Sequence, residues 1–264
     1  MTSSVCDVID LGLIEYQAAW KLQETYALEI ANGLRPPTLL LVEHPHVYTF
    51  GRSGHNENLL WSQEELARRG AAVHWVDRGG DVTYHGPGQL VGYPLIPLGK
   101  VEAPENPNSA AEPAGMTSTR IPIADYVGYL RQLEKVLIVS LARLGLGAGQ
   151  LPGLTGVWVQ PDVYSRCARC RSEDRARPAK IAAIGVKVDV NGISRHGFAL
   201  NVSPDMAYWD GIIACGLSDY PVVSLADLFP QVPDMQRVKL EIIRGFGEVF
   251  HHEMKFPTGS IKIR

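Results

Sequence analysis

The hydrophobic and polar positions along the chain change repeatedly between a helical period and an extended one. Residues 15–30 are good helix formers up to a stop at Asn32-Gly33, and residues 38–43 form a continuous apolar run typical of a strand buried on both faces. Six other strands are predicted, over 47–50, 73–76, 89–96, 156–159, 180–190 and 193–202. The last two flank Asn191-Gly192, a strong signal for a β-hairpin.

Polar caps predict where further helices begin. Ser62-Gln-Glu-Glu65 is a capping box that opens a short helix, Asp125 caps a long one, and Ser224 starts another short one. In the long helix and in a last helix over 239–252, apolar residues recur every three or four positions and predict one buried face. These residues are Val127, Leu130, Leu133, Leu137, Leu141 and Leu144, followed by Ile242, Ile243, Phe246, Val249 and Phe250.

The order of these elements indicates the fold class. Strands and helices mix without strict βαβ alternation, which favours an α/β fold with a mixed β-sheet flanked by helices over a Rossmann fold. We expect a single domain over residues 1–264, with surface insertions at 102–119 and 160–179, two polar segments with few large apolar residues. Cys167 and Cys170 in the second insertion have the spacing of half a zinc site, but no second such pair exists, so a surface loop is preferred over a metal or redox clip.

Composition excludes several classes of protein. Hydrophobic residues make up 45% of the 264 residues, as in a globular protein. The net charge is −3, so the chain lacks the overall positive charge that would indicate nucleic-acid binding. No run of about eighteen apolar residues predicts a transmembrane helix, and residues 1–7 lack the features of a secretory signal. Four cysteines in such a chain do not form a disulfide framework, which predicts a cytoplasmic protein with reduced thiols.

The stretch from Arg78 to Leu95 is the most unusual in the chain. Its four glycines and one proline alternate with charged and polar residues between two predicted strands. Glycine allows sharp turns and close approach of the backbone to a ligand, so the stretch predicts either a pocket wall or an ordinary long hairpin loop. The polar residues are Arg78, Asp81, Thr83, Tyr84, His85 and Gln89.

Three blocks of sequence, in this order, resemble the octanoyltransferases of lipoate biosynthesis. They are residues 78–94, Lys180-Ile-Ala-Ala-Ile-Gly185, and Ser194-Arg-His-Gly-Phe-Ala-Leu-Asn201 leading on to Ala214-Cys-Gly216. The resemblance implies a fold similar to the biotin and lipoate protein ligases. It also implies transfer of an octanoyl group from acyl carrier protein to a lysine of lipoyl domains.

Cys215 and Lys180 are the candidate catalytic residues. Cys215 has small neighbours that leave room for an acyl group, but a free thiol has a pKa of about 8.5 and needs a nearby cation, such as Lys180, to become a thiolate. From the residues alone, a lone cysteine is more often a small buried hydrophobe. The resemblance implies that Cys215 carries the acyl group as a thioester and that Lys180 pairs with it and acts as the general base.

The resemblance also implies which residues surround the acyl chain and its carbonyl. His85 and His196 among them are candidates for lining the pocket or relaying protons, although such histidines are more often structural. His44 and His46 receive at most a supporting role. The implied substrate-binding residues are Arg78, Gly79, Gly80, Asp81, Val82, Thr83, Tyr84, His85, Ala183, Ile184, Gly185, His196, Gly197 and Phe198.

The implied partners are octanoyl-acyl carrier protein as donor, and lipoyl domains of 2-oxoacid dehydrogenase complexes and the glycine cleavage H protein as acceptors. A thioester is already activated, so neither ATP, a metal nor another cofactor is expected. Two alternatives are an ATP-dependent ligase of the lipoate or biotin type and a non-catalytic acyl- or carrier-binding protein. Cys215 argues against the ligase, and the pair of Cys215 with Lys180 argues against a pure binder.

Overall fold

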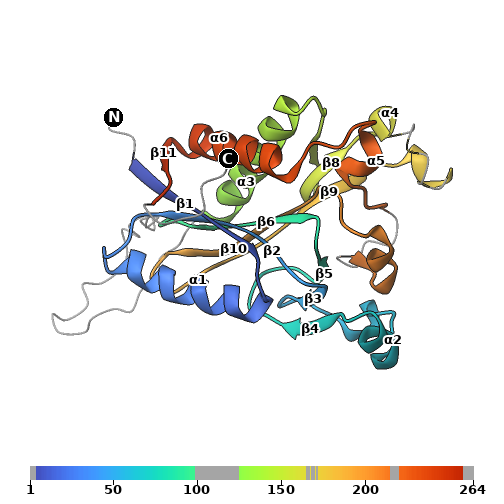
Figure 1. Ribbon diagram of the computed structural model, residues 1–264, viewed down its shortest axis with the longest axis horizontal. Coiled ribbons are helices and arrows are strands. Elements are labelled where there is room, and N and C mark those ends of the chain that lie inside the picture. Colours follow the sequence, from blue (N-terminus) through green and yellow to red (C-terminus); the bar gives the residue numbers. More distant parts are fainter. Residues whose placement is uncertain are drawn as a thin grey trace, which may run out of the picture.

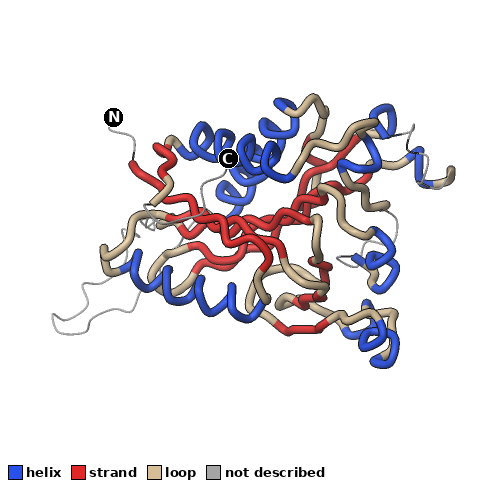
Figure 2. The backbone as a smooth tube through the Cα atoms, viewed as in Figure 1, coloured by secondary structure: helices blue, strands red, loops and turns tan. Residues whose placement is uncertain are grey.

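The computed structural model describes residues 4–98, 125–164, 167, 170, 172–214 and 220–257. Within these residues, eight strands form the main sheet (Figures 1 and 2), with β1 parallel to both of its neighbours and all other neighbouring strands antiparallel. In spatial order they are β11 (His252–Lys255), β1 (Ser4–Leu13), β2 (Thr38–Glu43), β6 (Gln89–Leu95), β10 (Ser194–Asn201), β9 (Ala179–Val188), β8 (Leu154–Val159) and β7 (Gly149–Leu151).

Helices cover both faces of the main sheet (Figure 1). Leu39 and Leu41 of β2 belong to the core under α3 (Tyr126–Arg143) and α6 (Met235–Phe250), whereas Leu40 and Val42 belong to the core under α1 (Tyr16–Ala31). Successive side chains of a strand point to opposite faces, so a continuous apolar run is what a strand between two helical layers requires. The prediction of a mixed sheet flanked by helices is confirmed.

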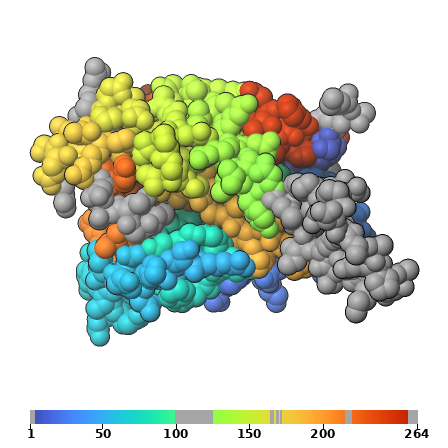
Figure 3. Space-filling model, turned by 180° about the vertical axis from the view of Figure 1, so that it is seen from behind, coloured from blue at the N-terminus to red at the C-terminus, as the bar shows by residue number. Residues whose placement is uncertain are grey.

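A small sheet lies beside the main one. Within the described residues it contains β4 (Ala72–Trp75), β3 (Val47–Phe50) and β5 (Val82–His85), with β3 parallel to β4 and antiparallel to β5. The helix α2 (Gln63–Arg68) and the 3₁₀ turns η1 (Asn56–Asn58) and η3 (Met206–Gly211) also belong to this region. The view from behind in Figure 3 shows the region in cyan, at the opposite side of the molecule from α6 in red.

The caps predicted from the sequence are confirmed. The side chain of Ser62 accepts a hydrogen bond from the backbone N–H of Glu65, and that of Asp125 accepts one from Gly128. Ser224 forms a capping box at α5 (Leu225–Leu228). The last helix begins at Met235 rather than at 239, because Asp234 caps it earlier.

Other expectations need correction. Val127 is 67% exposed, since it lies in the first turn of α3 before the helix reaches the sheet. The strand at 73–76 was expected to be buried, but β4 is at the edge of the small sheet and Trp75 is 54% exposed. Strands β1, β5, β7 and β11 were not predicted: β7 and β11 are too short for a clear pattern, and β5 lies inside the stretch interpreted as a turn.

The two insertions have different outcomes. Residues 102–119 lie outside the described residues. In the described part of 160–179, α4 (Pro161–Tyr164) and η2 (Asp174–Ala176) flank a disulfide between Cys167 and Cys170, whose Cα atoms are 5.4 Å apart. The expectation of reduced thiols is therefore wrong for this pair, since the spacing brings both cysteines within bonding reach. Cys167 is buried against the main core rather than exposed on a surface loop. Among the described helices, none has the length and apolar character needed to span a membrane.

Candidate active site

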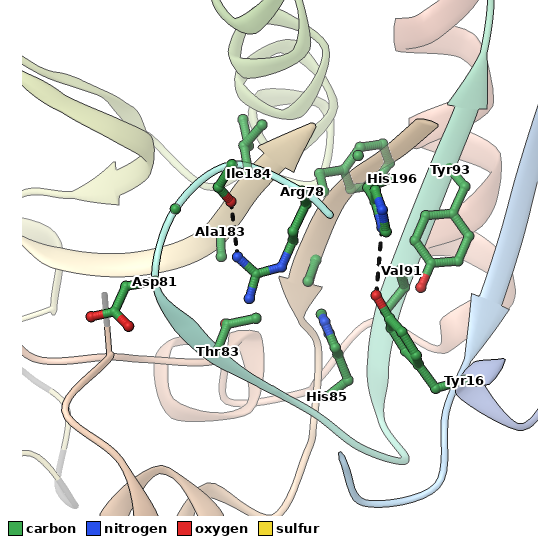
Figure 4. A pocket seen from close by; sticks show the side chains of 16 residues that line it. Tyr16, Arg78, Asp81, Thr83, His85, Val91, Tyr93, Ala183, Ile184 and His196 are labelled. Carbon is green, nitrogen blue, oxygen red and sulfur yellow. Dashed lines mark hydrogen bonds between the residues drawn. The ribbon is translucent and has the colours of Figure 1, made fainter. Parts of the chain in front are cut away.

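A pocket lies between the main sheet and the loop that leads into β5 (Figure 4). We call it the inner pocket. The lining residues come from the loop before β5 and from β5, β6, β9 and β10, with one residue from the start of α1. The lining residues are Tyr16, Arg78, Gly79, Gly80, Asp81, Thr83, His85, Val91, Tyr93, Ala183, Ile184, Gly185, His196, Gly197, Phe198 and Ala199.

A second, more open cavity adjoins the inner pocket, and we call it the outer hollow. The two share one wall, formed by Gly79, Gly80, Asp81, Ile184 and Gly185. The outer hollow is otherwise lined by Ser53, His55, Glu57, Asn58, Leu130, Thr155, Lys180 and Val186. The structure thus places Lys180 next to the inner pocket but not within it.

Lys180 is held by strand β9 and by an aromatic ring. Its ammonium nitrogen lies 4.7 Å from the centroid of the Trp158 ring, and its side chain is buried. Its backbone pairs on one side with the segment at Pro221, whose carbonyl oxygen accepts a hydrogen bond from the N–H of Lys180 at 2.8 Å. Such contacts fix the direction of a long, otherwise flexible side chain.

Cys215 lies outside the described residues. On each side of this gap, a described residue is hydrogen-bonded to a residue that lines the outer hollow. The N–H of Ile213 donates a hydrogen bond to the carbonyl oxygen of Asn58 at 2.9 Å, and Pro221 pairs with Lys180 as described above. Asn58 and Lys180 both line the outer hollow.

Alternation along β5 divides the expected site residues into two groups. Asp81, Thr83 and His85 line the inner pocket, whereas the side chains of Val82 and Tyr84 pack in the core of the small sheet. The expectation that these two side chains surround a substrate is corrected, because successive residues of a strand face opposite ways. The other implied substrate-binding residues all line the pocket.

The glycine-rich loop is fastened to the small sheet by charged groups. One guanidinium nitrogen of Arg78 donates to the carbonyl oxygen of Thr49 at 2.5 Å, and another donates to that of Gly79 at 2.9 Å. The carboxylate of Asp81 accepts hydrogen bonds from the N–H groups of Val82 and His55 and from the Asn58 amide. These contacts fix the wall shared by the two cavities.

His85 is a neutral base in the inner pocket. Burial, followed by the proximity of His44, lowers the pKa of His85 to about 3. The side-chain nitrogen of Gln89 donates to two carbonyl oxygens, so its oxygen must be the acceptor for Nδ1–H of His85 at 2.7 Å. The remaining ring nitrogen, Nε2, therefore carries the lone pair.

His196 links the inner pocket to an ion-pair cluster behind it. Its Nε2–H donates to Oδ1 of Asp77 at 2.7 Å, and its Nδ1 is 3.5 Å from the hydroxyl of Tyr16. Burial lowers the pKa of His196, against the opposing effect of the Asp77 carboxylate. His196 also has a left-handed φ of 56°, and its backbone N–H donates a hydrogen bond to the side-chain oxygen of Gln23. Backbone strain of this kind clusters at functional sites, where it fixes the direction of a side chain.

Asp77 was not identified from the sequence, although it directly precedes Arg78. It binds Lys187 and Arg195 in addition to His196. Partial burial works against ionisation, but the hydrogen bonds from His196 and Lys187 and the charge of Arg195 hold the pKa of Asp77 well below its usual range. It is therefore a fixed carboxylate that orients the ring of His196.

Tyr16 and Tyr93 were also missed: Tyr16 lies outside the motifs, and Tyr93 lies within residues 78–94 but is not among the polar residues singled out there. The Tyr93 hydroxyl donates to Nε2 of His44 at 2.7 Å, while Nδ1–H of His44 donates to the carbonyl oxygen of Ile14. Burial lowers the pKa of His44 to about 4, so it is a neutral support for Tyr93. His46 instead stacks on Tyr208, away from the inner pocket, with ring centroids 3.8 Å apart.

The inner pocket suits an uncharged, largely apolar chain. Val91, Ile184 and Phe198 supply apolar surface, and the histidines that line it are neutral. Gly92 allows the ring of Phe198 to pack at this position, since a Cβ at residue 92 would lie 2.2 Å from that ring. Among the described residues, no group of three or more histidine, cysteine or acidic side chains is arranged to hold a metal ion.

Comparisons with known proteins agree with this geometry. The family model of the lipoyl protein ligase A/B catalytic domain matches residues 15–247. The chain is 38% identical to the octanoyltransferase of Christiangramia forsetii, over 95% of this chain and 97% of that protein. It is 41% identical to the octanoyltransferase of Rubrobacter xylanophilus, over 90% of both chains.

Solved structures show the same fold at low sequence identity. A chain from the bipartite lipoate protein ligase structure of Thermoplasma acidophilum superposes with a TM-score of 0.66 and 15% identity, covering 99% of this chain and 88% of that one. Lipoate-protein ligase A bound with ATP superposes with a TM-score of 0.60 and 16% identity, covering 99% and 90%.

Proposed function

This chain belongs to the lipoyl protein ligase A/B catalytic-domain family and, within it, to the octanoyltransferases, and we propose that it transfers an octanoyl group to a lysine of a lipoyl domain. The observation that carries the proposal is the shared wall of Gly79, Gly80, Asp81, Ile184 and Gly185. It joins a pocket with apolar surface and neutral histidines, fit for an acyl chain, to a hollow that holds a buried lysine. A carbonyl at this wall would lie between the binding surface and the reactive group.

We propose a two-step transfer with Cys215 as nucleophile. Its thiolate attacks the thioester carbonyl of octanoyl-acyl carrier protein, and the carrier thiol leaves with the proton of the Lys180 ammonium group. The amine of the acceptor lysine then attacks the enzyme thioester, loses a proton to the now neutral Lys180, and releases the Cys215 thiolate. Lys180 acts first as the cation that favours the thiolate and then, deprotonated, as the general base. The N–H groups of the glycine loop are candidate donors to the oxyanion.

Of the fourteen residues implied by the family, twelve have a distinct role in this proposal. Ala183, Ile184, Gly197 and Phe198 would contact the acyl chain, and His85 and His196 would bound it as neutral groups. Gly79 and Gly80 would contribute backbone near the carbonyl. Arg78 and Asp81 would hold that backbone in place through the contacts described above, and Val82 and Tyr84 would serve the small sheet behind it.

We also propose that residues 1–264 act as one catalytic domain. The pairing of β1 with β11 supports this, because strands from both ends of the described chain complete one sheet. The donor and acceptors proposed are octanoyl-acyl carrier protein, and lipoyl domains of 2-oxoacid dehydrogenase complexes and the glycine cleavage H protein. We propose the cytoplasm as the location, because the Cys215 thiol needs reducing conditions; the Cys167–Cys170 disulfide, which joins residues three positions apart, is a local exception.

Intact-mass spectrometry after incubation with octanoyl-acyl carrier protein tests the proposal. We expect the protein to gain one octanoyl group that hydroxylamine removes and that Cys215→Ser lacks. Cys6→Ala is the matched control: burial raises the pKa of the Cys6 thiol to about 12, so its removal should leave the adduct in place. A wild-type protein that gains no mass, or that consumes ATP when given free octanoate, would contradict the proposal.

A further inference from the structure

We propose that Tyr16 sets the length of the acyl chain that the inner pocket accepts. This inference rests on the function proposed above. It concerns the end of the pocket opposite the wall shared with the outer hollow. In Figure 4, Asp81 of the shared wall lies on one side of the pocket, and Tyr16, Tyr93 and His196 lie on the other.

The position of the reacting atoms gives the chain its direction. Lys180 lines the outer hollow, so an acyl carbonyl that reacts there must lie at the shared wall. The alkyl chain then runs away from Lys180 through the inner pocket. Its terminal methyl group must meet the side chains that close the far end.

Of those side chains, Tyr93 is built firmly into the sheet. It belongs to β6, which lies between β2 and β10, and its hydroxyl is bonded to His44 at 2.7 Å. His85 and His196 are likewise held by short hydrogen bonds to Gln89 and Asp77. These residues form the fixed part of the far wall.

Tyr16 is a separate, less anchored part of that wall. It is the first residue of α1, and it packs in a small cluster with Val47, Val76 and Trp20 rather than in either core of the main sheet. Its hydroxyl makes a long contact, 3.5 Å, with His196. Tyr16 nevertheless is only 3% exposed and lines the inner pocket, so its ring separates the far end of the pocket from solvent.

The surroundings of Tyr16 show what its removal would open. Its ring stacks on His85, which lines the inner pocket, and on His74, which does not, with centroid distances of 5.9 Å in both cases. His74 is only half-buried and contacts Gln17 near the surface. A smaller side chain at position 16 would therefore extend the inner pocket toward His74, and a longer acyl chain could fill that space.

The test measures transfer from hexanoyl-, octanoyl-, decanoyl- and dodecanoyl-acyl carrier protein by wild type, Tyr16→Ala and Tyr16→Leu. The second variant keeps an apolar side chain in case the first does not fold. Each methylene newly buried increases kcat/KM about fourfold, and a decanoyl chain has two more methylenes than an octanoyl chain. We therefore expect the ratio of kcat/KM for decanoyl over octanoyl donor to rise about 15-fold in both variants.

Two controls separate the ring from its hydroxyl and from the helix. Tyr16→Phe keeps the ring, so the order of preference among the donors should stay that of wild type. Tyr26→Ala truncates another aromatic residue of α1 that does not line the inner pocket, and it should not change the order either. A change in Tyr16→Phe equal to that in Tyr16→Ala would assign the effect to the hydroxyl and overturn the proposal.

The outcomes distinguish this inference from the proposed function. If wild type transfers octanoate while Tyr16→Ala and Tyr16→Leu keep its chain-length ratio, the role of Tyr16 is refuted and the transferase stands. If wild type transfers no acyl group from any donor, the proposed function fails and the inference falls with it. Calorimetry of decanoate binding adds a measurement that does not depend on turnover. If Tyr16→Ala and Tyr16→Leu bind decanoate no more tightly than wild type does, the role of Tyr16 is also overturned.

Discussion

The inner pocket and the outer hollow share a wall but differ in every other respect. The inner pocket is closed by neutral histidines and tyrosines whose hydrogen bonds are made within the protein. The outer hollow is open, exposes Ser53, His55 and Glu57, and contains the ammonium group of Lys180. One cavity can hold an uncharged chain, and the other can admit protein-bound groups and exchange protons with water.

In the proposed function, this difference places binding and reaction on opposite sides of one piece of backbone. A thin, glycine-rich wall would let the carbonyl be reached from the outer hollow while the acyl chain stays in the inner pocket. Substitutions in the two cavities should therefore affect different measured quantities. The predictions below use that separation, from the largest expected effect to the smallest.

Replacing the lysine of the outer hollow should abolish reaction but not binding. Lys180→Met keeps the apolar stem against Trp158 and removes the ammonium group, so we expect transfer to fall by about 10²–10⁴-fold. Calorimetry should show octanoate binding close to that of wild type. Lys187→Met, on the same strand but outside both cavities, should retain most of the transfer activity. Equal losses in the two variants would contradict the separation.

Acid should destabilise the inner pocket through its histidines. The pKa of His85 is about 3 and that of His44 about 4 in the folded protein, against 6.5 for an unperturbed histidine. The unfolded chain therefore binds more protons between about pH 6.5 and about pH 4, and the free energy of unfolding falls as the pH falls through that window.

Each of these two histidines contributes a slope of up to about 1.4 kcal/mol per pH unit. Urea denaturation at several pH values should show this slope in wild type. His85→Gln should reduce this slope by the contribution of one histidine, whatever its effect on the free energy of unfolding at neutral pH. A slope that is unchanged in His85→Gln would mean that another group governs the acid response.

Removal of the Asp77 carboxylate, which lies behind His196, should have the smallest of these effects. Asp77→Asn removes the charge that pairs with Arg195 and Lys187, and we expect a loss of about 1–2 kcal/mol in the free energy of unfolding at neutral pH. The lowered pKa of Asp77 means that this contribution is present above the usual carboxyl range and is lost as the pH falls below it.

A matched control and a second readout accompany this variant. Glu24→Gln removes the other, exposed partner of Arg195 and should cost less than about 1 kcal/mol. NMR titration should show the pKa of His196 lower in Asp77→Asn than in wild type, because the carboxylate favours the protonated ring. An unchanged titration would remove Asp77 from its positioning role.

The sequence predicted the parts of the fold that depend on local signals. Caps such as Ser62 and Asp125, the apolar run of β2 and the Asn191-Gly192 hairpin each act over a few residues, and the structure confirms them. The pairing of β1 with β11 was not predicted, because Ser4 and His252 are brought together only by the folded sheet.

The candidate site was predicted to the extent that its residues lie in the motifs. The alternation in Asp81, Thr83 and His85 was visible in the sequence and could have excluded Val82 and Tyr84 from the pocket. Tyr16 and Asp77 carried no such signal. Their roles depend on which residues they contact across the fold, and a single sequence does not contain that information.

The pairing of β11 with β1 has a consequence for synthesis. Among the described residues, the outer edge of β1 is covered by residues 252–255, so a nascent chain keeps that edge open until these residues have left the ribosome. An uncovered strand edge is a template for pairing with other chains. We therefore expect the main sheet to close only after residues 252–255 have been made, and a chain stalled or shortened before them to be a target for chaperones.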